Sequence, residues 1–331
     1  MSRPLLLGLL VALAAAALVV MPLVGQQYIP PHALWGSAEP GQIDILWKLR
    51  IPRVCVALLA GMALAASGMA FQAVFRNALA EPFTLGVASG ASLGAAVAIH
   101  LGLGFSLLGY SAVSWLALAG ALAAILLVYG LTRAGQGFSP ATMLLAGVAV
   151  SFFFSSVILF LQYLSDFTRS FRMLRWVMGG MESVVGFEEV FDLLPVVVAG
   201  CLVIFSLTHE LNLITTGEEL AAARGVEINR TKAVLFFVTS LMVGAVVSVC
   251  GPIGFVGLMV PHICRLLVGP DHRYLAPASI LFGGVFLATC DTVARAALAP
   301  TELPVGILTS LLGGPFFLWL LLSRSGDIGG A

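Results

Sequence analysis

Long apolar runs separated by short polar connections dominate the chain. A helix needs about 20 apolar residues to cross the hydrocarbon core of a bilayer, and runs of this order recur along the whole sequence. The pattern predicts ten spanning helices, over residues 4–24, 54–74, 86–107, 111–132, 141–163, 190–207, 233–250, 253–269, 275–294 and 304–323. We therefore expect an all-α, polytopic membrane protein in which residues 1–331 form a single transmembrane domain.

The first apolar run, which follows Arg3, could instead be a cleaved signal peptide. The run continues to about Gly25, whereas the apolar core of a signal peptide is usually about 7–15 residues long. Its small residues lie in the middle of the run and not at its end, where a cleavage site needs them. We therefore expect a retained helix.

The composition fits a membrane protein. Only 10% of the residues are charged and 60% are hydrophobic, with a mean hydropathy of +1.06, whereas soluble domains have about 25% charged residues. The net charge of zero gives no electrostatic indication of a nucleic-acid partner. The five cysteines lie mostly inside apolar runs without C-x-x-C spacing, which favours buried small side chains over disulfides or metal ligands.

Ionisable side chains are scarce inside the predicted spans. His100 is expected to pack between helices or lie at the membrane interface, and Asp291 to form a helical pair with Arg295, four residues later. His262, a lone histidine beside a proline, is expected to be structural and not a metal ligand. Ion-coupled transporters usually depend on intramembrane carboxylates, so this scarcity argues against ion coupling.

The chain also lacks a nucleotide site of the phosphate-loop type. Such a loop has a lysine directly after a glycine, but the only two lysines, Lys48 and Lys232, follow Trp47 and Thr231. We expect no enzyme activity, no metal and no cofactor in this chain. Energy for transport must therefore come from a partner, or the chain must be a passive channel.

Small residues at four-residue spacing predict close helix packing. Gly86, Gly90 and Gly94 follow this spacing, and Gly61 with Ala65 is a weaker example. Small side chains let helix backbones approach each other in lipid, where no hydrophobic effect drives helices together. We expect these positions to be structural.

Two connections, residues 164–189 and 208–232, hold most of the polar residues. In the second, a short amphipathic helix is expected to begin at Thr216 or Gly217, with Glu218 and Glu219 in its first turn, and to end at Gly225. This helix would lie on the membrane surface. An ordinary polar connector is the alternative.

Charge counting does not decide the orientation of the chain. Ten spans place both termini on one side, and the cationic side chains are then divided almost evenly between the two sides. The cluster Lys48, Arg50 and Arg53 would lie outside if the termini are cytoplasmic, against the usual excess of positive charge inside. Either the topology is inverted or these side chains have another purpose.

Several stretches together resemble the FecCD-type permease subunits of bacterial ABC importers, which take up iron-siderophores, haem or cobalamin. They are "LRIPRVCVALLAGMALAASGMAFQAVFRNALAEPFTLGVASGASLGA" (49–95), "LLAGVAV" (144–150), "GEELAAARGV" (217–226), "GPIGFVGLMVPHICRLLVGPDHRYLAPAS" (251–279) and "DTVARAALAPTELPVGILTSLLGGPFFLWLL" (291–321). The chain departs at Ala78, where the family usually has proline, and at Arg224, where it often has an apolar residue.

The resemblance implies a homodimer in the bacterial inner membrane, with both termini cytoplasmic and the path along the dimer axis. Two cytoplasmic ATPase subunits would bind ATP and Mg and would receive the coupling loop, about 208–232. The coupling residues would then be Gly217, Glu218, Glu219, Ala222 and Gly225. The lipid bilayer and a periplasmic substrate-binding protein complete the implied partners.

By the same resemblance, the periplasmic binding protein would dock through its acidic residues onto Arg50, Arg53 and Arg295. Guanidinium groups suit such docking because they make bidentate bonds to carboxylates, although contact with lipid headgroups is the alternative. The cytoplasmic gate of the path would lie at Ser139, Pro140, Ala141 and Thr142, at the start of the fifth span.

The function expected from the resemblance is import of a metal chelate from periplasm to cytoplasm, with an iron-siderophore expected first and haem or cobalamin otherwise. A passive channel or a secondary transporter for a small solute is the alternative, and it predicts transport that is insensitive to nucleotide. A non-transporting scaffold predicts no flux at all.

Overall fold

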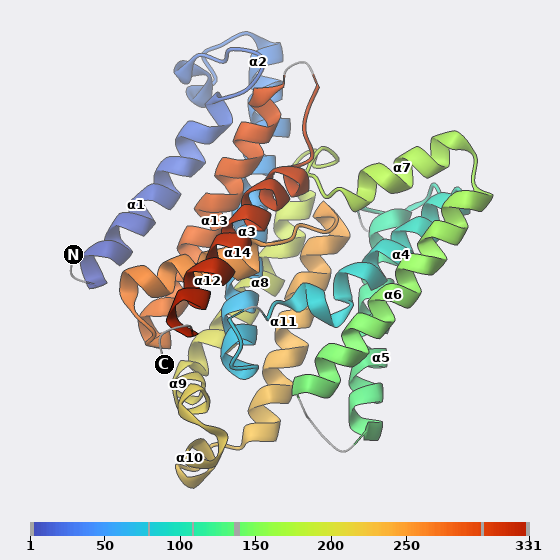
Figure 1. Cartoon of the computed structure of the whole chain (residues 1–331). Coiled ribbons are helices and arrows are strands. Elements are labelled where there is room, and N and C mark those ends of the chain that lie inside the picture. Colours follow the sequence, from blue (N-terminus) through green and yellow to red (C-terminus); the bar gives the residue numbers. More distant parts are fainter. Residues whose placement is uncertain (1–2, 79, 108, 136–139, 299–300, 329–331) are drawn as a thin grey trace.

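The computed structural model describes residues 3–78, 80–107, 109–135, 140–298 and 301–328 (Figure 1). The α-helices are α1 (Arg3–Val20), α2 (Pro40–Asp44), α3 (Ile51–Val74), α4 (Val87–His100), α5 (Ala112–Gly135), α6 (Pro140–Leu164), α7 (Phe167–Val177), α8 (Glu188–Ser206), α9 (Thr208–Thr216), α10 (Glu218–Ala223), α11 (Ile228–Cys250), α12 (Val256–Val268), α13 (His272–Ala297) and α14 (Val305–Ile328). Shorter elements are η1 (Met21–Leu23), η2 (Pro31–Trp35), η3 (Ile45–Arg50), η4 (Pro82–Leu85) and a hairpin of β1 (Ser106–Leu107) and β2 (Tyr110–Ser111).

The helices confirm the all-α polytopic fold. Within the described residues, seven helices are long and apolar enough to cross a membrane, and three shorter apolar helices are Val87–His100, Val256–Val268 and Val305–Leu320. Two predicted spans are too long. The span over 86–107 ends at His100, since Gly102 has a positive φ of 65° and a hairpin follows. The span over 253–269 begins only after Phe255, whose φ is 68°.

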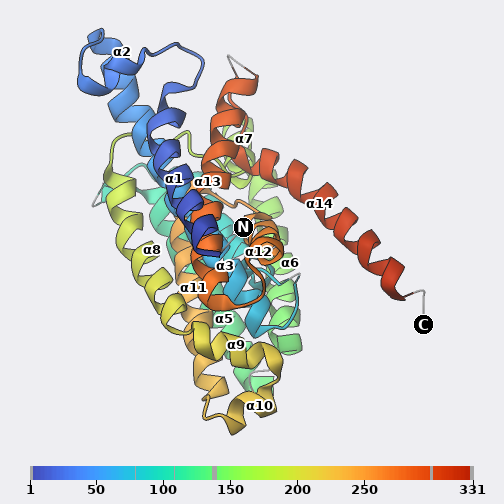
Figure 2. The same cartoon turned by 90° about the vertical axis from the view of Figure 1, so that its left-hand side faces the viewer.

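α3 forms the centre of the bundle and is buried along almost its whole length. It contacts α8, α11, α12 and α13, while α4, α5 and α6 pack on one another and join this centre through α11. α1 lies outside and packs mainly on α13. Figure 2 shows α14 leaning away from the bundle, with only its first turns close to the other helices.

Glycines allow the closest helix contacts. A side chain on Gly61 of α3 would collide with the carbonyl group of Gly283 on α13, and one on Gly90 of α4 with that of Gly120 on α5. These contacts confirm the structural role predicted for the small residues. Gly86 has a different role, since it precedes α4 with a φ of 81°.

The bundle has two polar ends, named here for the short helices that they carry. At the α2 end lie η2, α2 and the last turns of α13; the α10 end carries α9 and α10 (Figure 1). α1 runs toward the α2 end and α14 runs away from it, so both termini point to the α10 side. The 164–189 connection contains a helix that was not predicted, α7, whose N-terminus is capped where the Asp166 carboxylate accepts the backbone N–H of Arg169 at 2.9 Å.

Candidate coupling and docking sites

α10 is a short helix held between two glycines at one end of the bundle. Gly217 has a φ of 148° and Gly225 a φ of 86°, conformations that other residues rarely adopt. The N–H of Gly225 donates to the carbonyl of Ala222 at 2.9 Å and closes the helix. The short helix predicted to begin near Gly217 and to end at Gly225 is therefore present.

One face of α10 packs on the protein and the other is exposed. Ala221 is buried in a small apolar cluster with Ile214 of α9. Glu219 and Ala222 are exposed, and Leu220 is 49% exposed. An apolar side chain beside a charged one, on a helix that projects past the bundle, is suited to contact with another protein.

An ion pair fixes α10 to the bundle. Lys232 at the start of α11 donates from Nζ to Glu218 at 2.8 Å, and the side chain of Lys232 is only 4% exposed. Because a buried ammonium group is costly without a partner, this pair determines where α10 sits. Glu218 is therefore engaged within the chain, whereas Glu219 is exposed.

Asn212 connects α9 to the start of α13. Its side-chain N–H donates to Asp271 at 2.8 Å, and its oxygen accepts the backbone N–H of His272 at 2.9 Å. The backbone N–H of Arg273 and the Asn212 amide hold the pKa of Asp271 below its ordinary value. Sequence reasoning missed this contact, because a lone asparagine in a polar segment carries no motif.

The three arginines predicted to dock a binding protein come together at the α2 end. All three are nearly buried: Arg50, Arg53 and Arg295 are 6%, 7% and 5% exposed. Arg53 donates from Nε and Nη2 to Asp291 at 3.0–3.2 Å, and from Nη1 to Glu302 at 2.7 Å. The docking role remains a prediction, since these side chains are engaged within the chain itself.

Backbone carbonyl groups cover the other two arginines. Arg50 donates to the carbonyls of Pro22, Leu23 and Gln27, at 2.7–3.4 Å. Arg295 donates from Nη2 to the carbonyl of Met21 at 3.3 Å. The helical pair predicted between Asp291 and Arg295 is wrong, because the Asp291 carboxylate hydrogen-bonds to Arg53 on the neighbouring helix.

The predicted gate is only partly described. Ser139 lies outside the described residues, and α6 begins at Pro140. Ala141 is exposed and Thr142 is half-buried on the first turn of α6. The gate role therefore stays a prediction.

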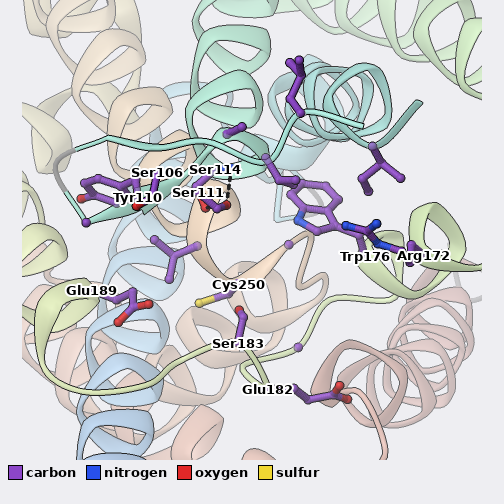
Figure 3. Close-up of a pocket in the computed structure, with 18 of the residues that line it drawn as sticks. Ser106, Tyr110, Ser111, Ser114, Arg172, Trp176, Glu182, Ser183, Glu189 and Cys250 are labelled. Atoms are coloured by element: carbon purple, nitrogen blue, oxygen red, sulfur yellow. Dashed lines mark hydrogen bonds between the residues drawn. The ribbon is translucent and has the colours of Figure 1, made fainter. Parts of the chain in front are cut away.

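Sequence reasoning missed a cavity of about 660 Å³ toward the α2 end. Figure 3 shows Tyr110 and Glu189 on one side of it and Trp176 with Arg172 on the other. Tyr110 donates to Asp192, and burial together with this carboxylate raises the pKa of the phenol. The lining comes from the hairpin, α7, α8 and the end of α11, so no local sequence pattern could reveal it.

The two singled-out histidines have packing contacts. Nδ1 of His100 lies 2.7 Å from Oγ of Ser165, which joins the ends of α4 and α6. The ring of His262 meets the edge of Phe316 with centroids 5.8 Å apart. In the part of the chain that the structure describes, no group of three or more His, Cys, Asp or Glu residues could hold a metal ion.

The fold and its two polar ends define a multi-pass membrane protein with a short helix that projects from one end, a form compatible with the permease subunits of ABC transporters. The chain belongs to the FecCD transport family, whose sequence model matches residues 9–323.

Relatives support this assignment along nearly the whole chain. The cobalamin import system permease protein BtuC of Halobacterium salinarum is 44% identical over 88% of this chain and 76% of its own length. The hemin transport system permease protein HmuU of Yersinia pestis is 36% identical over 97% and 96%. A solved structure described as an inward-facing, metal-chelate type ABC transporter aligns with a TM-score of 0.85 at 30% identity, covering 97% of this chain and 99% of that one.

Proposed function

We propose that the chain is the membrane-spanning permease subunit of an ABC importer that moves a metal chelate from the periplasm to the cytoplasm. Partner ATPase subunits would supply the energy, and a periplasmic binding protein would deliver the chelate. Relatives named for cobalamin and for hemin support a chelate as substrate. Ferric siderophore, haem and cobalamin are the three candidates.

The single observation that carries this proposal is the geometry of α10. The helix projects from the bundle, is fixed at its base by Glu218 and Lys232, and presents Leu220 and Glu219 outward. Through α9 and Asn212 it is connected to α13, which runs the length of the bundle to the arginines. A push on α10 by an ATPase would thus reach the transmembrane helices as a rigid-body movement.

The α10 end would be cytoplasmic and the α2 end periplasmic, in the inner membrane. This orientation places both termini in the cytoplasm and the arginine cluster outside. A second copy of the chain would complete the path. Exposed apolar side chains on α14, at Leu311, Leu312, Leu318 and Trp319, support such a pairing because this helix leaves the bundle.

Reconstitution in liposomes tests the proposal. The chain would be inserted with its ATPase partner, and binding proteins for haem, cobalamin and ferric siderophore would be added outside, one at a time. We expect uptake of one chelate class that requires ATP on the ATPase side. Uptake that is equal without ATP would identify a passive channel or a secondary transporter and would overturn the proposal.

A pair of matched charge reversals tests the role of α10. We expect Glu219→Lys to lower ATP-dependent uptake roughly tenfold, as about 1.4 kcal/mol of lost coupling energy would do. Asp44→Lys reverses another exposed acid, at the opposite end, and should leave the ATPase contact intact. Equal uptake by the two variants would contradict the coupling role.

A further inference from the structure

The arginine cluster holds two acids in different environments. We define the cluster as Arg50, Arg53, Arg295, Asp291 and Glu302, whose charges act on one another. The side chain of Asp291 is 1% exposed, whereas that of Glu302 is 31% exposed. Asp291 is therefore an internal part of the fold, while Glu302 covers Arg53 from the solvent side.

The cluster has one cation more than it has anions, with three guanidinium groups and two carboxylates. The excess positive charge lies at Arg295, which is 5% exposed. Its Nε and Nη1 atoms are buried without a hydrogen-bond partner among the described residues. Buried donors on a charged group are normally satisfied. The cluster is therefore built to accept a further anion.

Glu302 also lies in the segment that connects α13 to α14, three residues before α14 begins at Val305. The N–H of Leu303 donates to the carbonyl of Ala294 on α13 at 3.3 Å, and that of Gly306 to the carbonyl of Gly179 at 3.1 Å. The side-chain hydrogen bond from Arg53 to Glu302 connects this segment to α3, at the centre of the bundle. Whatever replaces Glu302 at Arg53 releases the start of α14 from α3.

We propose that Glu302 occupies the position on the Arg53 guanidinium at which a carboxylate of a partner protein docks. A carboxylate on the surface of the delivering binding protein displaces Glu302 from Nη1 of Arg53 and occupies the free donors of Arg295. Docking thereby frees the segment that leads into α14. The inference rests on the proposed function, because that function supplies the partner.

Replacing Glu302 by a partner's carboxylate changes the free energy only modestly, so docking can be reversible. One carboxylate replaces another on the same guanidinium, so the net change comes from the additional bonds to Arg295. Because Glu302 is partly exposed, its ion pair is weakened by solvent. We expect removal of its charge to tighten docking roughly three- to tenfold and not by orders of magnitude.

The first test needs no partner. Hydrogen–deuterium exchange of the chain in lipid nanodiscs is compared among the wild type, Glu302→Gln and Glu182→Gln. Glu182 is a matched control, since it is a similarly exposed carboxylate at the α2 end that pairs with Arg175 and lies outside the cluster. We expect faster exchange over Val305–Ser310 only in Glu302→Gln; unchanged exchange there would overturn the inference that Glu302 restrains the start of α14.

The second test measures docking of the binding protein that supports uptake in the liposome experiment. We expect Glu302→Gln to lower its Kd roughly three- to tenfold, with Glu182→Gln unchanged. A Kd that is unchanged or higher in Glu302→Gln shows that Glu302 does not compete with the partner and overturns the inference. If no binding protein supports uptake, the proposed function is wrong. The hydrogen–deuterium exchange measurement still reports, independently, whether Glu302 restrains α14.

Discussion

The charged residues predicted to meet partners differ in exposure between the two polar ends of the bundle. At the α2 end, Arg53 is 7% exposed and its guanidinium is occupied by acids of the same chain. At the α10 end, Glu219 is exposed. Both ends were predicted from sequence to meet another protein, yet the three arginines predicted to dock it are nearly buried, whereas Glu219 is exposed.

This difference follows from which elements hold the charges. Arg53 and Asp291 lie on α3 and α13, two long helices that approach closely through Gly61 and Gly283. Glu219 lies on a helix of six residues bounded by glycines. The long, closely packed helices bury their terminal charges against each other, whereas the short projecting helix leaves Glu219 exposed.

Removal of the buried acid should produce the largest effect. Asp291→Asn keeps the side-chain shape but leaves Arg53 and the excess charge of the cluster uncompensated. Breaking a buried ion pair costs about 3–5 kcal/mol, so the thermal unfolding midpoint in detergent should fall strongly. Glu302→Gln, which affects the same arginine from a more exposed position, is the control and should shift the midpoint much less. Equal shifts would show that burial does not distinguish the two acids.

The second largest effect is expected where α3 and α13 approach each other closely. A methyl group at Gly61 would collide with the Gly283 carbonyl, so Gly61→Ala should cost about 1–3 kcal/mol of stability. Gly130→Ala on α5 is the matched control, because no atom lies within 4 Å of its added Cβ and alanine favours a helix. A Gly61→Ala protein as stable as the control would mean that the burial at the α2 end does not depend on this contact.

At the α10 end, Glu218→Gln should have a local effect. It leaves the buried Lys232 without its anion, and loss of a partner for a buried charged group costs about 1–3 kcal/mol. Hydrogen exchange should therefore quicken over α10 while the unfolding midpoint changes little. The neighbouring change Glu219→Gln removes an exposed charge and should leave exchange unaltered; faster exchange in both variants would argue against the Lys232 anchor.

The smallest effect is expected for the exposed pair of Asp44 and Lys48, whose side chains are 61% and 67% exposed. Asp44→Asn should change stability by less than about 0.5 kcal/mol, because solvent screens such pairs. A larger loss, measured by the same thermal unfolding, would show that the α2 end depends on its surface charges as well as on its buried ones.

The predicted spans followed from local pattern alone, and for that reason most of them were confirmed. An apolar run of sufficient length has few alternatives to a helix in lipid. α7 was missed because it has only 11 residues, three of them arginines, and so lacks the long apolar run by which the spans were recognised. Asp166, which caps this helix, was a usable signal.

The internal engagement of the arginines could not have been predicted from sequence. Arg53 lies 238 residues before Asp291 and 249 before Glu302, and no local rule connects them. The spacing of Asp291 and Arg295 suggested a helical pair, but the tertiary partner of Asp291 prevailed because Arg53 offers it bidentate contact inside the bundle. The α10 helix was predictable, since its glycines and its first-turn acids are signals contained within nine residues, 217–225.

Cross-linking of α10 to an ATPase tests the central claim most directly. A cysteine at the exposed Ala222 should form an adduct with the ATPase subunit in transport-active liposomes, and its yield should change between ATP-bound and nucleotide-free states. A cysteine at the exposed Ser37, at the α2 end, should form none. Active transport without any adduct at Ala222 would contradict the coupling role of α10 and the orientation that depends on it.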